Sequence, residues 1–174
     1  MSVSVPPITR YERLQRLARR FPQLDASAIE TCIALLRLSN ELSGAYETRM
    51  ARHGLSTGRF TVLVRLLSTQ ESEGGRGLTP AELAENSCVS RATMTGLLDT
   101  LEKDGLISRQ DHPEDRRMYT VHLTPKAQAL LEELVPQHFS RVATLMSDLD
   151  DTERATLREL LTKVSGRLPS FLEP

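Results

Sequence analysis

Apolar residues recur at helical spacing along most of the chain, and one shorter stretch alternates with a period of two residues. The helical spacing predicts helices near residues 11–21, from 27 to about 53, from 125 onward and from 150 onward. A capping box at Ser27 and Glu30 is expected to begin the long second helix, and Gly54 is expected to end it. Pro136 is expected to bend the helix that begins at Pro125. The chain is therefore expected to be mainly helical.

Residues 79–105 contain two short helices with clear start signals. Thr79, Pro80 and Glu82 form a capping box with proline at the first helical position, which begins the first helix. Ser90 is an N-cap for the second helix, and Gly105 suits the position just after its C-terminus. Three leucines of the second helix recur at helical spacing and are expected to pack inward: Leu97, Leu98 and Leu101.

The alternating stretch follows these helices. Strands are predicted at residues 106–109 and 118–123, where Tyr119, Val121 and Leu123 alternate with other side chains. The segment between the strands is polar and contains Pro113, so it is expected to be a hairpin loop. Two short helices followed by a hairpin predict a winged helix-turn-helix, in which the second helix enters the major groove of DNA.

Candidate DNA contacts cluster at the start of the second short helix and at the hairpin tip. Hydroxyl and guanidinium groups on the helix can bond phosphates or base edges. An arginine at the tip can enter a narrow A·T-rich minor groove, while Asp115 holds a neighbouring guanidinium in a bidentate pair. The predicted DNA-binding residues are Ser90, Arg91, Thr93, Met94, Thr95, Arg116 and Arg117.

Other interpretations of the same patterns do not involve DNA. The two capped helices could be a plain helical hairpin, and the charged tip could be a solvated cluster. A winged helix could also serve protein–protein contact. The combination of a hydroxyl-rich helix and an arginine-bearing hairpin favours DNA binding.

Residues 78–127 resemble the winged helix-turn-helix of the MarR family of bacterial transcription regulators. The family patterns LT..ELA, S.AT.T..L..LE..GLI.R and P.DRR...V.LT match at residues 78–84, 90–109 and 113–124. Weaker similarity covers residues 55–63 and 149–154. Ala127 stands where the family often has glycine, and the expected loop at 68–77 is longer than usual. The resemblance implies a DNA-binding regulator and makes Arg117 the expected minor-groove residue.

The charge of the chain does not by itself indicate a nucleic-acid partner. The formal net charge is −1, and residues 58–123 hold 8 Lys/Arg against 10 Asp/Glu, which gives −2. Residues 1–57 hold 8 Lys/Arg against 5 Asp/Glu, which gives +3. Because DNA-binding domains are usually basic, DNA contacts here must depend on the placement of individual cations. Weak nonspecific binding is expected.

Composition argues against several other classes of protein. The 174 residues are 39% apolar and 26% charged, as in ordinary globular proteins. No apolar run is long enough to cross a membrane, and the N-terminus lacks the layout of a secretory signal. The four histidines lie far apart, and the glycine-rich segment 73–77 lacks the ending of a phosphate loop. We therefore expect a cytoplasmic protein. It is not expected to be an enzyme, to hold a metal or cofactor, or to bind a membrane.

The flanking helices predict a homodimer. Their apolar faces exceed what a small winged domain can cover, and the resemblance implies the same assembly. The expected organisation is one compact unit with three parts: residues 1–57 for dimerisation and an effector crevice, 58–123 for DNA binding, and 124–174 for dimerisation. A homodimer predicts a pseudo-palindromic operator in double-stranded DNA, with half-sites about one helical turn apart.

Two mechanisms of regulation are consistent with the sequence. The first is a ligand-responsive repressor, and the resemblance implies a small aromatic or phenolic effector. The second is a thiol-based redox sensor that uses Cys32 or Cys88. Both cysteines are expected to be buried, which favours the first mechanism because a reactive thiol needs exposure and a lowered pKa. The candidate effector-binding residues are Arg49, Met50, His53 and Phe60.

Overall fold

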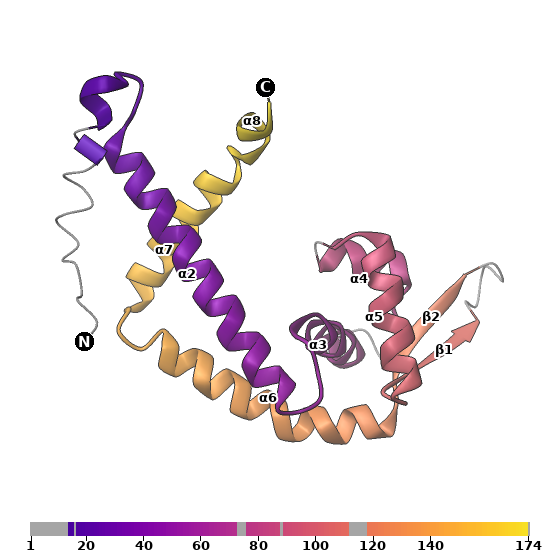
Figure 1. Ribbon diagram of the computed structural model, residues 1–174. Coiled ribbons are helices and arrows are strands. Elements are labelled where there is room, and N and C mark those ends of the chain that lie inside the picture. Colours follow the sequence, from indigo (N-terminus) through magenta and orange to yellow (C-terminus); the bar gives the residue numbers. More distant parts are fainter. Residues whose placement is uncertain (1–13, 16, 73–75, 88, 112–117, 174) are drawn as a thin grey trace. The chain divides into compact units, whose positions relative to one another are not determined.

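The computed structural model describes residues 14–15, 17–72, 76–87, 89–111 and 118–173. The chain divides into two compact units, residues 1–60 and 61–174 (Figure 1). The elements are α2 (Ala26–Ala51), α3 (Thr57–Ser72), α4 (Pro80–Asn86), α5 (Arg91–Lys103), β1 (Ile107–Asp111), β2 (Tyr119–Leu123), α6 (Pro125–Leu145), α7 (Asp151–Ser165) and α8 (Leu168–Leu172). Residues 14, 15 and 17–20 are also helical. This order confirms the predicted mainly helical fold with a small β-wing.

The first unit is dominated by α2. Its N-cap is Asp25, whose Oδ1 accepts hydrogen bonds from the backbone N–H groups of Ser27 (2.9 Å) and Ala28 (3.0 Å). The expected start at a Ser27 capping box is therefore wrong by two residues, because an aspartate that satisfies two orphan N–H groups begins the helix earlier. Gly54, with φ of 68°, turns the chain just beyond the end of α2, as expected.

A carboxylate on α2 organises the start of α3. Glu47 Oε2 accepts hydrogen bonds from the backbone N–H of Thr57 (3.0 Å) and from its hydroxyl (2.7 Å). These bonds lower the pKa of Glu47, since they favour the charged carboxylate. Arg59 also donates to the carbonyl of Gly54 at 3.1 Å. The turn between α2 and the first residues of α3 is thus fixed by side-chain contacts within the first unit.

The second unit contains the winged helix-turn-helix. Strands β1 and β2 pair antiparallel, from Ile107 opposite Leu123 to Asp111 opposite Tyr119. Leu78 pairs with Val121 through two backbone hydrogen bonds of 3.2 and 2.8 Å, which fastens the segment before α4 to β2. Helices α4 and α5 contact each other, α4 and α6 contact β2, and α5 contacts β1. Fully buried side chains of this unit include Leu63, Leu66, Leu83, Met94, Leu98, Leu101, Val121, Leu131 and Leu134.

Two expectations about helix limits differ from the structure. Helix α3 continues to Ser72, so residues 68–72 are helical rather than part of a long loop. Helix α6 runs through Pro136 to Leu145, so the proline does not end it, and the expected bend stays a prediction. The last predicted helix is two helices, because α7 ends at Ser165 and Leu168 belongs to the short α8, where Pro169 occupies the first turn.

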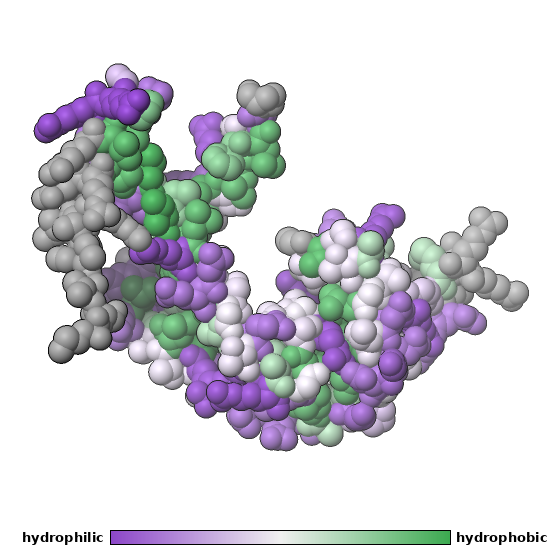
Figure 2. Space-filling view, in the orientation of Figure 1, coloured by the Kyte–Doolittle hydropathy of each residue, from purple (hydrophilic) through white to green (hydrophobic). Residues whose placement is uncertain are grey.

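Large hydrophobic side chains remain exposed on the terminal helices. No residue of α7 is buried, and Phe171 and Leu172 on α8 are 82% and 81% exposed. Figure 2 shows hydrophobic surface over α8 and the N-terminal half of α2, where Leu36 is exposed. Cys32 on α2 is exposed too, so its expected burial is wrong for the single chain, which lacks a cover for this face. None of the described helices is long and apolar enough to span a membrane.

The bonds between Glu47 and Thr57 predict a pH-dependent contribution to stability. Because the folded pKa of Glu47 lies below its usual value of 4.5, the contribution is present above that value and disappears as the pH falls through the folded pKa. Glu47→Gln should therefore lower the Tm at pH 7 and have a smaller effect at pH 3, measured by circular dichroism. Glu41→Gln, which changes an exposed glutamate of the same helix, controls for the loss of one charge. Equal effects of Glu47→Gln at both pH values would contradict this role.

Candidate nucleic-acid interface

The orientation of α5 is set by its buried side. Met94, Leu98 and Leu101 are completely buried, and their spacing places them on one face of the helix. Leu97 is half-buried at the edge of that face. Met94 was expected among the DNA contacts, and this is wrong: its side chain is part of the core, although it lies in the first turns of the helix. The opposite side of α5 is left for a partner.

The other predicted residues at the start of α5 are exposed, but their hydroxyl groups are already bonded. Ser90 Oγ accepts from the backbone N–H of Thr93 at 3.1 Å, as expected of an N-cap, and lies 2.8 Å from Thr93 Oγ1. The hydroxyl of Thr95 donates to the carbonyl of Arg91 at 3.0 Å. The role of Ser90, Arg91, Thr93 and Thr95 in binding DNA stays a prediction, and their exposure is consistent with it.

Helix α4 is held by the predicted capping box. Thr79 Oγ1 accepts from the backbone N–H of Glu82 at 3.3 Å, and Glu82 Oε2 accepts from the backbone N–H of Thr79 at 2.7 Å. Arg76 forms an ion pair with the second carboxylate oxygen of Glu82 at 2.9 Å. Partial burial alone would raise the pKa of Glu82, but the hydrogen bonds from Thr79 and Arg76 outweigh it and the pKa is lowered. The capping box and the ion pair therefore stabilise the N-terminus of α4, the first helix of the motif.

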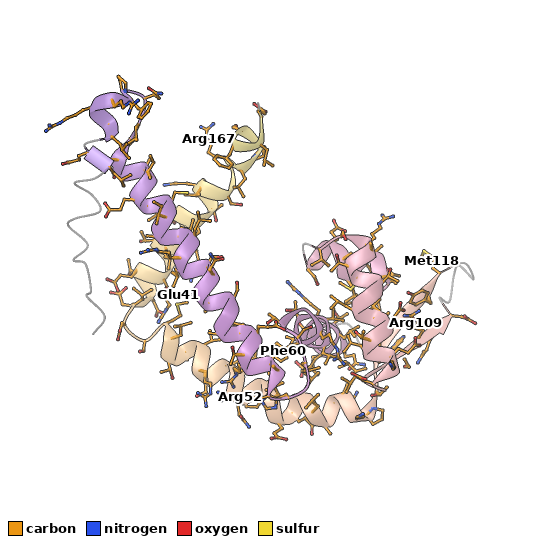
Figure 3. The ribbon with its side chains drawn as sticks, viewed as in Figure 1. Glu41, Arg52, Phe60, Arg109, Met118 and Arg167 are labelled. Carbon is orange, nitrogen blue, oxygen red and sulfur yellow. The ribbon has the colours of Figure 1, made fainter. Side chains whose placement is uncertain are left out.

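Arg109 joins the second helix to the hairpin (Figure 3). Its Nη2 lies 2.5 Å from Asp99 Oδ1 and its Nε lies 3.2 Å from Glu102 Oε2, both on α5. Its guanidinium also lies 5.0 Å from the ring centroid of Tyr119 on β2. The hydrogen bond with Asp99 raises the pKa of Arg109. One cation thus orients α5 against both strands and offsets two carboxylates beside the predicted DNA-reading surface.

Arg109 was not among the predicted site residues. The available signal was its place at the end of the GLI.R pattern, ten residues after Asp99. The predicted wing-tip residues Asp115, Arg116 and Arg117, and also Cys88, lie outside the described residues, so their roles stay predictions.

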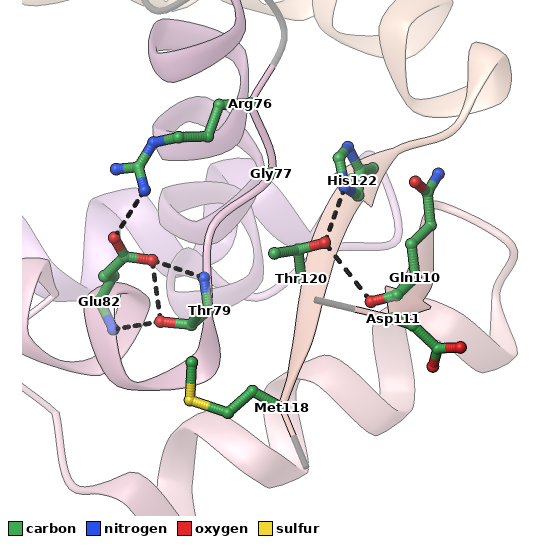
Figure 4. Close-up of a pocket in the computed structure, with 9 residues that line it drawn as sticks. All are labelled: Arg76, Gly77, Thr79, Glu82, Gln110, Asp111, Met118, Thr120 and His122. Atoms are coloured by element: carbon green, nitrogen blue, oxygen red, sulfur yellow. Dashed lines mark hydrogen bonds and ion pairs between the residues drawn. The ribbon is translucent and has the colours of Figure 1, made fainter. Parts of the chain in front are cut away.

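A cleft of about 600 Å³ lies at the base of the wing, between the start of α4 and β2 (Figure 4). The Nε2 of His122 lies 3.0 Å from the hydroxyl of Thr120, and that hydroxyl lies 3.4 Å from the carbonyl of Gln110. The imidazole of His122 packs directly over Gly77, where a β-carbon would collide with it. The lining residues are Arg76, Gly77, Thr79, Glu82, Gln110, Asp111, Met118, Thr120 and His122.

The predicted effector residues all belong to the first unit. Met50 is completely buried and Phe60 is 5% exposed, whereas Arg49 and His53 are half-buried. Burial of Met50 and Phe60 agrees equally with a core role, so effector binding by these four residues stays a prediction. Among the described residues, no group of three or more His, Cys, Asp or Glu side chains is placed to hold a metal ion.

Comparison with known proteins identifies the family. The model of the MarR family matches residues 56–119. The chain is 34% identical over 164 residues to the HTH-type transcriptional repressor YetL of Bacillus subtilis (strain 168), covering 94% of this chain and 96% of that protein. The chain belongs to the MarR family. It is also 34% identical over 148 residues to the transcriptional repressor MprA of Escherichia coli (strain K12), covering 85% of this chain and 80% of that protein.

Solved structures of other MarR-family proteins have the same fold. A DNA complex of MepR from S. aureus covers 78% of this chain and 96% of its own, with a TM-score of 0.69 and 23% identity. A structure of Bordetella bronchiseptica BpsR, whose DNA binding is regulated by 6-hydroxynicotinic acid, has a TM-score of 0.63 and 27% identity, and covers 76% of this chain and 91% of its own. Family and fold together identify a DNA-binding transcription regulator.

Two glycines predict opposite effects of the same substitution. Gly77→Ala should destabilise this MarR-family protein by about 1–3 kcal/mol, because the new methyl group must displace His122 from its place over the backbone. Gly44→Ala should stabilise it by about 0.5–1 kcal/mol, because Gly44 lies inside α2 with open space around it. Urea unfolding measures both changes. His122→Ala should reduce the cost of Gly77→Ala, and a cost that does not change would contradict this packing.

Proposed function

We propose that the protein is a homodimeric repressor that binds a pseudo-palindromic operator and releases it when a small molecule binds. The observation that carries the proposal is the exposed outer side of α5, which the buried inner side of the helix holds in place. The similarity of 94% of the chain to a named transcriptional repressor supports it. Binding to chromosomal DNA implies action in the cytoplasm and requires no catalysis, metal or cofactor.

The exposed terminal helices support the dimer. Leu157, Leu160, Leu161 and Val164 are all exposed, and on α7 they recur at the spacing of one helical face. Contiguous apolar surface of this kind is rare on monomers and marks an interface. A second copy of the chain is the occupant proposed here. Two copies also place two recognition helices in successive major grooves, which accounts for binding despite a net charge of −1.

A small aromatic acid or phenol is the proposed class of effector. Such a molecule needs an apolar surface with a few polar groups, and Arg49, Met50, His53 and Phe60 in the first unit supply both kinds of side chain. The regulation of BpsR by 6-hydroxynicotinic acid supports an effector of this chemistry. The effector must have different affinities for the DNA-binding and the released conformation, because otherwise it shifts no equilibrium.

Redox sensing is the second candidate, and the exposure of Cys32 favours it. Its neighbours one turn away on α2 are Ala28, Ile29, Leu35 and Leu36, so the helix provides no cation beside the sulfur to stabilise a thiolate. The effector mechanism therefore remains the preferred one.

A dimer that reads an operator predicts the following behaviour. Light scattering at micromolar concentration should give the mass of two chains, and selection from random duplexes should enrich half-sites roughly 10 base pairs apart. Arg117→Ala should weaken binding to the enriched duplex by about 1–3 kcal/mol while leaving the Tm unchanged, since a wing tip buries little. Monomeric mass, or unchanged affinity after replacement of both Arg116 and Arg117, would contradict the proposal.

Oxidation separates the two mechanisms of regulation. If a small molecule is the signal, organic hydroperoxide should leave wild type bound to the enriched duplex, as it should the Cys32→Ser/Cys88→Ser variant. Fluorescence anisotropy of labelled duplex measures both proteins under the same treatment. Release of wild type alone would identify a redox sensor and contradict the effector mechanism.

A further inference from the structure

Two exposed threonines of α5, Thr95 and Thr100, have committed their hydroxyl protons to the helix itself. Thr95 Oγ1 donates to the carbonyl of Arg91 at 3.0 Å, and Thr100 Oγ1 lies 3.1 Å from the carbonyl of Gly96 and 2.8 Å from that of Leu97. A proton used in this way is not available to the acceptors of a base edge, such as guanine O6 or thymine O4. The Thr95 side chain can therefore offer a base its methyl group or the lone pairs of its oxygen, but not a proton.

Gly96 lies beside Thr95 on the exposed side of the same helix. Glycine inside a helix costs stability relative to alanine, so its presence needs a reason. A β-carbon at Gly96 would meet nothing within 4 Å, so packing inside the described chain does not supply one. Missing side chains allow a backbone to approach another molecule closely. In a recognition helix, that molecule is the DNA.

The rest of the outer side of α5 lacks the groups that read bases by paired hydrogen bonds. Bidentate contacts use Arg or Lys for guanine and Asn or Gln for adenine. Helix α5, all of whose residues are described, contains neither Asn nor Gln, and its cations are Arg91 at the first position and Lys103 at the last. Between them, Ala92 lies one turn before Gly96, and both are exposed. The exposed surface of α5 therefore presents the methyl groups of Ala92 and Thr95 beside the backbone of Gly96, which carries no side chain.

We propose that α5 recognises thymine by contacting the C5-methyl group of the base. The methyl groups of Ala92 and Thr95 contact thymine methyls in the major groove, and Gly96 gives the helix the clearance to come close enough. Apolar contact with the thymine methyl is an established means of direct readout. The inference rests on the proposed operator binding and adds which base the recognition helix selects. Arg91 stays at the edge of this surface, where it can bond phosphate or guanine.

A competing explanation uses the oxygen of Thr95. A hydroxyl that donates to a carbonyl keeps lone pairs, which can accept from the amino group of adenine or cytosine. The two explanations differ in which half of the side chain matters, so the DNA and the protein can each be changed to separate them.

The DNA arm uses full-length protein and a duplex enriched from a random library. Each thymidine of the enriched duplex is replaced singly by deoxyuridine, which removes the methyl group but keeps O4 and the base pairing. One or more positions in each half-site should lose about fourfold in affinity, the scale of burying one methyl group. Thymidines outside the half-sites serve as controls and should tolerate the change. Tolerance at every position would overturn the inference.

The protein arm exchanges the two halves of the threonine side chain. Thr95→Val keeps a methyl group and loses the hydroxyl, and it should bind within about twofold of wild type. Thr95→Ser keeps the hydroxyl and loses the methyl group, and it should lose about fourfold and become insensitive to deoxyuridine at the contacted position. Thr144→Ser is the matched control, because Thr144 makes the same bond to Ser140 on α6 at 3.0 Å. Full affinity of Thr95→Ser with weakened Thr95→Val would overturn the inference.

Gly96→Ala tests whether Gly96 serves DNA binding or only the structure of the helix, because a purely structural role would leave DNA affinity unchanged. The substitution should raise the Tm, because alanine favours the helix, and should weaken binding to the enriched duplex several-fold. Gly44→Ala, at a glycine inside α2 that also has open space around it, should raise the Tm without weakening binding. If no duplex is enriched at all, operator binding fails and this inference fails with it. Enrichment combined with tolerance of deoxyuridine, or Gly96→Ala binding at full affinity, would overturn the inference alone.

Discussion

The burial of Met94, Leu98 and Leu101 fixes the rotation of α5 about its own axis, and the DNA-reading surface depends on that rotation. Each of these side chains contributes about 1.5–3 kcal/mol by leaving water. Turning the helix by one residue, or roughly 100°, would expose part of this set, so the core holds the outer side in one orientation. Arg109 then fixes α5 against the hairpin. The chain has no excess of positive charge to hold DNA loosely, so such fixed geometry must provide the affinity.

Much of this fold could be predicted from the sequence because its signals are local. The capping box at Thr79 and the one at Asp150 each involve residues three positions apart, and both are present. Gly105 has φ of 69°, a backbone conformation that glycine adopts readily, so the end of α5 was also predictable. Local signals failed where two competed, as at the start of α2, where Asp25 rather than Ser27 is the cap.

The remaining features depend on contacts between distant parts of the chain. Met94 lies among exposed polar residues in the sequence, and only the packing of α5 shows that it faces the core. The contact of His122 with Gly77 joins residues 45 positions apart, and no pattern in the sequence predicts it. Cys32 was expected to be buried from its apolar neighbours, but a helix face is buried only if something covers it. The predicted roles of Arg116 and Arg117 rest on the sequence alone, since these residues lie outside the described residues.

Helix α7 has a consequence for how the subunits of a dimer can separate. It is 15 residues long and none of them is buried, so a lone chain stabilises it mainly through its cap, its own side-chain pairs and the bonds of Arg154 to the carbonyls of Met146 and Leu149 in the preceding turn. Helices of this length are marginal in water without packing. If a second copy covers α7, helix formation and association become one equilibrium, and a departing subunit must give up helical order as it leaves. Exchange of subunits between dimers would then be limited by helix melting rather than by diffusion.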